Sequence, residues 1–172
     1  MVLFLVTRLF PIIKNFYMSF FDWPMLGRVK TFIGLGNYQE LMLDSQFILA
    51  MTNTFKFAIT SIIVIMLLGL PIAITLNKKY RFSVFYQMVY FIPYVTSMVP
   101  MAIGWKWIYD PKYGLLNHIL SWFGVEPISW LLNPDIAIWA VTAMNIWKNL
   151  GFSVVLLIVG LKNIPSSITE AA

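Results

Sequence analysis

Apolar residues gather in four long stretches that are separated by more polar segments. The stretches are residues 1–21, 55–76, 82–108 and 136–161. At a helical rise of 1.5 Å per residue, each is about long enough to cross a hydrocarbon core of roughly 30 Å. The pattern predicts an all-α, polytopic membrane helix bundle with about four spanning helices present, in a single transmembrane domain that covers residues 1–172.

The charges of the connecting segments predict an orientation. The short turn at residues 77–81, Asn-Lys-Lys-Tyr-Arg, carries cations and no acid, whereas residues 22–54 and 109–135 contain charges of both signs. Short loops rich in Lys and Arg stay in the cytoplasm. The turn is therefore predicted to be cytoplasmic and both longer loops external. Lys162, just past the last apolar stretch, agrees, so that both chain ends are expected in the cytoplasm.

The first external loop contains a weaker helical pattern. Its apolar residues at nearly helical spacing are Tyr38, Leu41, Met42, Phe47 and Leu49. Such spacing among polar residues predicts either an amphipathic helix that lies on the membrane surface or an ordinary packed loop helix.

Composition supports a membrane protein and excludes several other classes. Hydrophobic residues make up 60% of the chain and charged residues only 11%. The net charge of +5 comes from Lys and Arg spread thinly along the chain, so no nucleic-acid partner is expected. With no cysteine and a single histidine, His118, the sequence predicts neither a thiolate nor a multi-histidine metal site, and no cofactor is expected.

Prolines fall inside two of the predicted spans. Pro71 lies in the second, and Pro93 and Pro100 lie in the third. Each removes a helix hydrogen bond and is expected to kink the helix, which can open a cavity. Prolines are also common in spanning helices in general, so they give only modest support to a transport function.

The fourth span carries polar residues near its centre. Asn145, Lys148 and Asn149 are spaced i, i+3, i+4, which places them on one helical face. A lysine at mid-bilayer costs about 3 kcal/mol and normally faces a protein interior or a watery cavity. Two interpretations follow: Lys148 hydrogen-bonds carbonyls at a kink or pairs within the bundle, or this face lines a transport pathway.

The sequence offers little for catalysis. It contains no HExxH, GxSxG or GxxxxGK motif, and its Asp and Glu residues lie in loops or at span ends. An intramembrane enzyme would need reacting groups at depth, so this class is disfavoured.

The end of the chain predicts a short helix on the cytoplasmic side. Pro165 follows the last span, and Ser167 with Glu170 three residues later fits a capping box. Alone, so short a helix would be marginal, because helix nucleation is unfavourable. The small residues Ala171 and Ala172 suit docking into a groove of a partner, although a helix resting on lipid is the alternative.

These last residues resemble a known family. Leu161-x-x-Ile164-Pro165 running into Glu170-Ala171-Ala172 resembles the opening of the EAA loop of bacterial ABC importer permeases. Further resemblances occur in order along the chain: Phe32-Ile-Gly-Leu-Gly-Asn-Tyr38, Asn53-Thr54, Phe91-Ile-Pro93, Trp105-x-Trp-x-Tyr-x-Pro-x-Tyr-Gly-x-x-Asn117 and Trp147-Lys148. Together they are similar to the carbohydrate-uptake branch, of the maltose and glycerol-phosphate type.

The resemblance implies a mechanism and a set of partners. Glu170, Ala171 and Ala172 match the coupling positions, with Ile164 and Pro165 setting the entry angle of a coupling helix. That helix would insert into a cytoplasmic ATPase dimer, which would hydrolyse the ATP, so this chain itself would not be an enzyme. A second permease subunit, an extracytoplasmic solute-binding protein and the lipid bilayer of the bacterial inner membrane complete the implied assembly.

The resemblance also implies an incomplete chain. Family members continue past the EAA residues with a glycine, an I-x-L-P segment and at least two more spans. This chain is therefore expected to be part of a larger ABC-permease fold and to end at the start of the coupling helix. One alternative of another class remains: a non-transporting membrane scaffold whose cytoplasmic helix recruits a partner. Solute uptake would distinguish the two.

Overall fold

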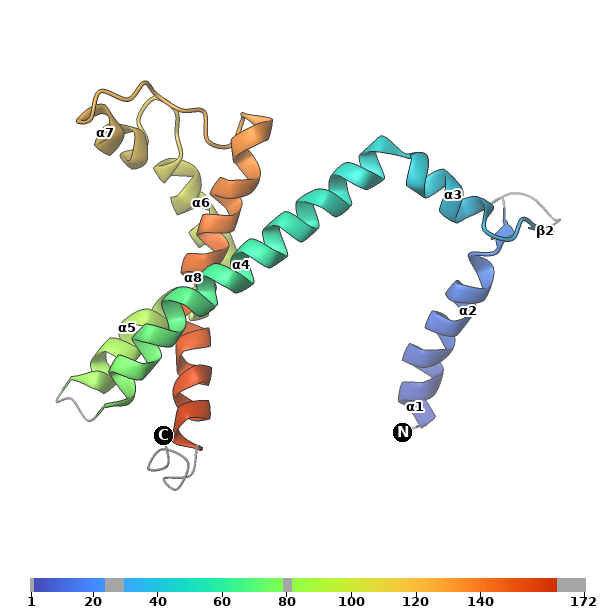
Figure 1. The fold of residues 1–172 in the computed structure, drawn as a ribbon, viewed down its shortest axis with the longest axis horizontal. Coiled ribbons are helices and arrows are strands. Elements are labelled where there is room, and N and C mark those ends of the chain that lie inside the picture. The colour runs from blue at the N-terminus through green and yellow to red at the C-terminus, as the bar shows by residue number, and fades with distance from the viewer. Residues whose placement is uncertain (1, 24–29, 79–81, 164–172) are drawn as a thin grey trace. The chain divides into compact units, whose positions relative to one another are not determined.

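The residues that the structure describes fold mainly into helices. The computed structural model describes residues 2–23, 30–78 and 82–163 (Figure 1). The chain divides into two compact units, Met1–Thr54 and Phe55–Ala172, and the boundary between them lies within one long helix. This helical architecture confirms the predicted all-α class.

The first unit begins with a helical stretch in three parts. They are α1 (Val2–Phe4), a π-helical turn (Leu5–Leu9) and α2 (Phe10–Met18). In the π turn, the Phe10 N–H donates to the carbonyl of Leu5, five residues earlier. Pro11 follows directly and has no N–H to continue the regular pattern, so the wider turn lies where that pattern would fail.

The first predicted span is therefore shorter than predicted. Its helix ends at Met18, and strand β1 (Phe21–Asp22) pairs antiparallel with β2 (Thr31–Phe32) in a small hairpin. The described helical stretch at residues 2–18 has a length of about 25 Å, less than the hydrocarbon core requires.

Asn37 and Tyr38 connect this hairpin to the next helix, α3 (Gly36–Leu43). The Asn37 side-chain amide donates to the carbonyls of Ser19 (2.8 Å) and Phe21 (3.2 Å). The hydroxyls of Ser19 and Tyr38 lie 2.6 Å apart and share a hydrogen bond. These contacts give the polar residues of the Phe32–Tyr38 motif a local structural role.

The prediction of a single amphipathic helix in this loop is wrong in one respect, because its residues are divided between two helices. Its first three members lie in α3, whereas Phe47 and Leu49 lie in α4 (Ser45–Asn77). Asp44 separates the helices with an extended backbone, and its carboxylate accepts the N–H of Gln46 at 2.8 Å. This is the capping geometry of an aspartate at a helix start, and it interrupts the apolar repeat.

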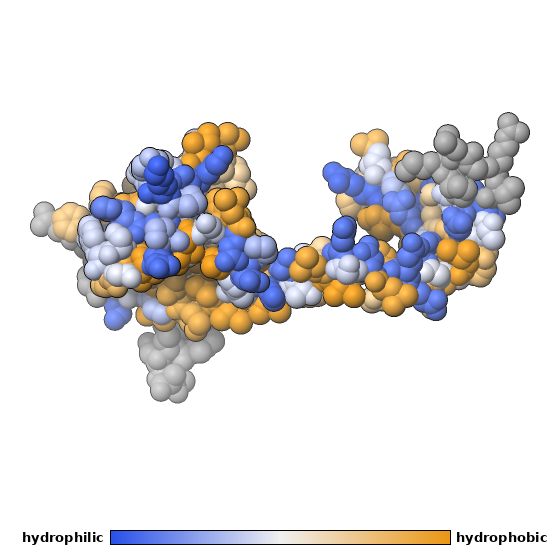
Figure 2. Space-filling view, turned by 90° about the horizontal axis from the view of Figure 1, so that it is seen from above, coloured by the Kyte–Doolittle hydropathy of each residue, from blue (hydrophilic) through white to orange (hydrophobic). Residues whose placement is uncertain are grey.

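Helix α4 contains the second predicted span and begins ten residues before it. It continues through Pro71, and the Thr75 hydroxyl donates to the Pro71 carbonyl at 2.8 Å. Large apolar side chains such as Ile62 and Leu67 remain 63% and 67% exposed. Figure 2 shows extensive apolar surface on the molecule, as expected for helices that face lipid.

The third predicted span is broken into two helices, α5 (Ser83–Val95) and α6 (Met98–Ile108). They are bent by 94° at the break. Pro93 precedes the break and Pro100 follows it. The prolines predicted a kink in one rod, and the structure instead has a full interruption at Thr96 and Ser97.

Helix α8 (Pro134–Lys162) contains the fourth predicted span. The Asn133 carboxamide oxygen caps its start by accepting the Asp135 N–H at 2.9 Å. Its later half packs on α4, where the core consists of Ala73, Leu76, Val154 and Ile158.

Helix α8 also lies very close to α5. A Cβ added at Gly151 would overlap the backbone carbonyl of Tyr90, so no larger residue fits there without a backbone shift. The neighbouring rings of Tyr94 and Phe152 stack with centroids 4.4 Å apart. Small residues at such crossings are typical of helix packing in membranes.

The loop between α6 and α8 is held by Asn117 of α7 (Leu115–Ser121). The Asn117 amide donates to the carbonyls of Pro111 (3.1 Å) and Ile128 (2.9 Å), and its oxygen accepts from Trp130 Nε1 (2.9 Å). The Tyr109 hydroxyl donates to the carbonyl of Ala140 in α8 at 2.9 Å. The loop is therefore ordered against the start of α8.

By length and composition, the described residues contain two helices that can each cross a membrane, α4 and α8. The bent pair α5 and α6 makes a third if it counts as one span. The multi-pass membrane class is confirmed. The first predicted span corresponds to the shorter helical stretch at residues 2–18.

Candidate functional site

The polar face predicted on the fourth span is present on α8. Asn145, Lys148 and Asn149 are all partly buried, and each makes hydrogen bonds inside the second unit. The three residues lie together because they are separated by about one helical turn. The face is directed toward α4 and toward the break between α5 and α6.

Lys148 binds backbone carbonyls at that break. Its Nζ donates to the carbonyls of Pro93 (3.2 Å), Tyr94 (3.1 Å) and Thr96 (2.8 Å). The structure thus shows the first of the two interpretations for this residue, in which the amine hydrogen-bonds carbonyls at a kink. Its position on a transport pathway stays a prediction.

The two asparagines form a separate polar connection to α4. Asn145 Nδ2 donates to the Ser61 hydroxyl at 3.1 Å, and Ser61 itself is only 6% exposed. Asn149 Nδ2 donates to both the backbone and the side-chain oxygen of Asn145, at 2.9 Å each. Amide and hydroxyl groups grouped in this way can exchange hydrogen bonds with a polar, uncharged solute.

An apolar cleft of about 470 Å³ lies beside the break. Trp105 of α6 and Trp147 of α8 meet there edge to face, with ring centroids 5.5 Å apart. The residues that line the cleft are Thr96, Pro100, Met101, Gly104, Trp105, Ile108 and Trp147. Thr96 lines this cleft, and its backbone carbonyl is one of the three that Lys148 binds.

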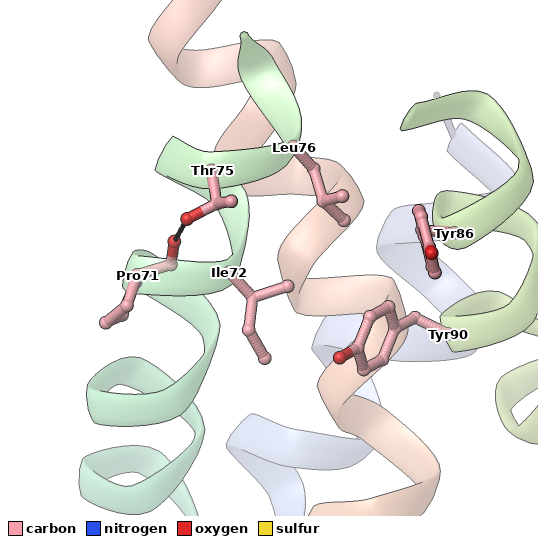
Figure 3. A pocket seen from close by; sticks show the side chains of 6 residues that line it. All are labelled: Pro71, Ile72, Thr75, Leu76, Tyr86 and Tyr90. Atoms are coloured by element: carbon pink, nitrogen blue, oxygen red, sulfur yellow. Dashed lines mark hydrogen bonds between the residues drawn. The ribbon is translucent and has the colours of Figure 1, made fainter. Parts of the chain in front are cut away.

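A second pocket, of about 370 Å³, lies between α4 and α5 (Figure 3). Tyr86 and Tyr90 reach from α5 toward Ile72 and Leu76 of α4. Figure 3 also shows the hydrogen bond from Thr75 to the carbonyl of Pro71, which completes the lining. The lining is mostly apolar, with the tyrosine and threonine hydroxyls as its polar side-chain groups.

The predicted coupling positions lie outside the described residues. Ile164, Pro165, Glu170, Ala171 and Ala172 all follow Asn163, the residue that caps the end of α8. Their role stays a prediction.

Metal chemistry has no candidate in the part of the chain that the structure describes. There, no three His, Cys, Asp or Glu side chains lie close enough to hold a metal ion.

Sequence reasoning missed the partners of the polar face. Ser61 is one hydroxyl within a long apolar run, and small hydroxyl residues are ordinary in spanning helices, so its pairing with Asn145 had no local signal. The carbonyls that Lys148 binds are backbone groups more than fifty residues away in the chain. For the close helix contact at Gly151 the sequence held only a weak signal, which was a glycine between two large residues, Leu150 and Phe152.

The fold and its inward polar face define a polytopic helical membrane protein. No protein-family profile matches the chain. It is 36% identical over 175 residues to the probable ABC transporter permease protein YurN of Bacillus subtilis, which covers 99% of this chain and 60% of that protein. It is 32% identical to the trehalose/maltose transport system permease protein MalF of Thermococcus litoralis, over 98% of this chain and 57% of that protein.

A solved structure has the same fold. It is a bacterial ABC transporter involved in the import of alginate, with a TM-score of 0.77 and 23% identity over 99% of this chain and 57% of the matched chain. The chain is therefore a homologue of ABC transporter permease proteins, which are transport proteins, and the resemblance found in the motifs is confirmed. It spans about three fifths of the length of the curated relatives it matches.

Proposed function

We propose that this chain is part of a permease subunit of an ATP-driven, binding-protein-dependent sugar importer in the inner membrane. The observation that carries the proposal is similarity along 98–99% of the chain to permeases, one of which is named for trehalose and maltose transport. Others are named for xylose and arabinose or for diacetylchitobiose. A carbohydrate is therefore the proposed class of solute.

In this proposal the Asn145 and Asn149 face lines the pathway. Both amides are partly buried, and that of Asn145 donates to the Ser61 hydroxyl of α4, which supports a polar interior at this depth. The amine of Lys148 donates to carbonyls, so the amides are the groups that this face offers to sugar hydroxyls.

The energy would come from partner subunits. A cytoplasmic helix that begins near Pro165 would couple the permease to an ATPase dimer, which binds and hydrolyses ATP. A second permease subunit would complete the pathway, and an extracytoplasmic solute-binding protein would deliver the sugar. One related structure, 22% identical, is described as a complex with an alginate-bound periplasmic protein.

Uptake in whole cells tests the transport proposal. In a strain that lacks the gene, accumulation of radiolabelled maltose, xylose, arabinose or diacetylchitobiose is expected to fall for at least one sugar. The full-length gene should restore it, whereas Asn145→Leu in the same gene should restore markedly less. Unchanged uptake of all these sugars would favour the membrane-scaffold alternative.

Cross-linking tests the coupling helix independently of the sugar. In the full-length permease, Ala171→Cys is expected to form a disulfide with a cysteine introduced in the ATPase encoded alongside. Tyr113→Cys, in the predicted external loop, is the matched control and should give no product. Equal cross-linking of both variants, or of neither, would contradict the proposed coupling.

A further inference from the structure

The break between α5 and α6 leaves carbonyl groups without helical partners. In a continuous α-helix, the carbonyl of Pro93 would accept from residue 97 and that of Tyr94 from residue 98. The 94° bend removes this arrangement. The carbonyl of Thr96 would pair with residue 100, which is a proline and has no N–H.

Lys148 binds these same three carbonyls. Its Nζ lies 3.2, 3.1 and 2.8 Å from the oxygens of Pro93, Tyr94 and Thr96. A lysine ammonium has three hydrogens to donate, so one side chain satisfies all three acceptors. A cation at this place also meets the negative end of the α5 dipole.

The pairing of the Lys148 amine with these carbonyls matters because the break lies within a predicted membrane span. Water is scarce within a bilayer, so backbone groups freed by a broken helix must find partners inside the protein. Here the partner comes from a different helix, α8, which is itself held against α5 at Gly151 and Tyr90. The position of the amine is therefore fixed relative to the break.

We propose that Lys148 is the positioning residue that holds the bend between α5 and α6. By holding Thr96 it also shapes the cleft in which Trp105 and Trp147 meet. Without the amine, the three carbonyls lose their donors, and the α5–α6 pair samples straighter conformations in which the carbonyls of Pro93 and Tyr94 can pair along the chain. This inference concerns a structural state and does not depend on the proposed transport function.

Distance measurement between spin labels tests the proposal in the full-length protein reconstituted in bilayers. Cysteines replace Val84 and Trp107, which are 61% and 60% exposed on α5 and α6, in a cysteine-free background. A straight helix would separate these backbones by about 35 Å, whereas a bend of 94° shortens the separation to about 23 Å. The two states therefore give well-separated distance distributions.

The protein with the native Lys148 should give a narrow distribution of short distances between the two labels. Lys148→Met is expected to broaden it toward longer distances, whereas Lys148→Arg, which still donates, should stay close to the native distribution. Lys106→Met is the matched control, because it removes the same charge from an exposed position on α6, and it should change nothing. An unchanged distribution in Lys148→Met would overturn the proposal.

A second label pair separates loss of the bend from general unfolding. Met88 on α5 and Leu156 on α8 are exposed, and labels there report the packing of α5 on α8. This distance should be the same in the native protein and in the Lys148→Met variant, because the Gly151 contact remains. If both distances broaden together, Lys148 supports the whole bundle and the specific proposal is wrong.

If Lys148→Met does not accumulate in membranes, Lys148→Gln takes its place. Glutamine has a shorter reach and two donor hydrogens, so a smaller broadening of the α5–α6 distance is expected. A native distribution in Lys148→Gln would also overturn the proposal.

Discussion

Gly151 lies where two helices of the second unit, α5 and α8, approach each other closely. Its missing side chain lets the backbone of α5 pass next to α8 at Tyr90. The stacked rings of Tyr94 and Phe152 depend on this approach, since Phe152 directly follows Gly151 and Tyr94 lies one turn after Tyr90. A single hydrogen in place of a methyl group therefore sets the spacing between α5 and α8, the helix that carries the polar face.

Gly151→Ala should lower the stability of the purified protein. The added methyl group would overlap a backbone carbonyl, and overpacking of this kind costs about 1–3 kcal/mol or more. Thermal unfolding in detergent measures the effect. Gly160→Ala is the control, because a Cβ there meets no atom within 4 Å, and it should unfold at the native temperature or above. Equal unfolding temperatures for both variants would contradict the close approach.

Asp110 organises the start of the loop after α6. Its carboxylate accepts the backbone N–H groups of Tyr113 (2.7 Å) and Lys112 (2.9 Å). The bond from Tyr113, followed by that from Lys112, lowers the pKa of Asp110 below its ordinary value of 3.8. The charged form of the carboxylate is therefore the one that the folded loop prefers.

The lowered pKa predicts an acid-sensitive loop. Because the folded pKa of Asp110 lies below the unfolded one, the carboxylate's stabilising contribution is complete above about pH 4 and is lost as the pH falls through the folded pKa. The difference in unfolding temperature between the native protein and Asp110→Asn should therefore shrink as the pH is lowered through this range. Tryptophan fluorescence measures the unfolding temperature, and a difference that is independent of pH would show that folding does not lower the pKa of Asp110.

At the scale of elements, the sequence predicted the two long spans because hydropathy over about twenty residues dominates them. Residues 55–76 and 136–161 lie within α4 and α8. The start of α4 was missed because it depends on one aspartate. Asp44 caps the helix at residue 45, and a hydropathy window does not register a single capping side chain.

The third span shows where local signals stop being informative. Pro93 and Pro100 predicted a disturbed helix, but the size of the bend depends on what satisfies the carbonyls that are freed. That partner, Lys148, lies on another helix. Helical spacing placed Asn145, Lys148 and Asn149 on one face correctly, yet it could not say which groups they meet, because those contacts join residues far apart in the chain.

At the scale of the whole molecule, the second unit has two distinct ends. Leu76 packs beside Ile158 and Leu161, so the C-terminal ends of α4 and α8 lie together, as Figure 1 shows. At the other end, Tyr109 joins the loop after α6 to Ala140, near the start of α8. The end of α4 and the end of α8 are thus on one side of this unit, which agrees with the pattern of charges.

Labelling of sealed cells tests which end faces the cytoplasm. In a cysteine-free background, Tyr113→Cys, 71% exposed in the loop, should react with a membrane-impermeant maleimide in intact cells. Lys78→Cys and Asn163→Cys should react only after permeabilisation, because short loops rich in cations stay inside. If all three reactivities are reversed, the orientation is wrong, and the proposed coupling to a cytoplasmic ATPase fails with it. If Lys78→Cys and Asn163→Cys differ from each other, the two helix ends lie on opposite sides of the membrane, which would contradict the packing of Leu76 on α8.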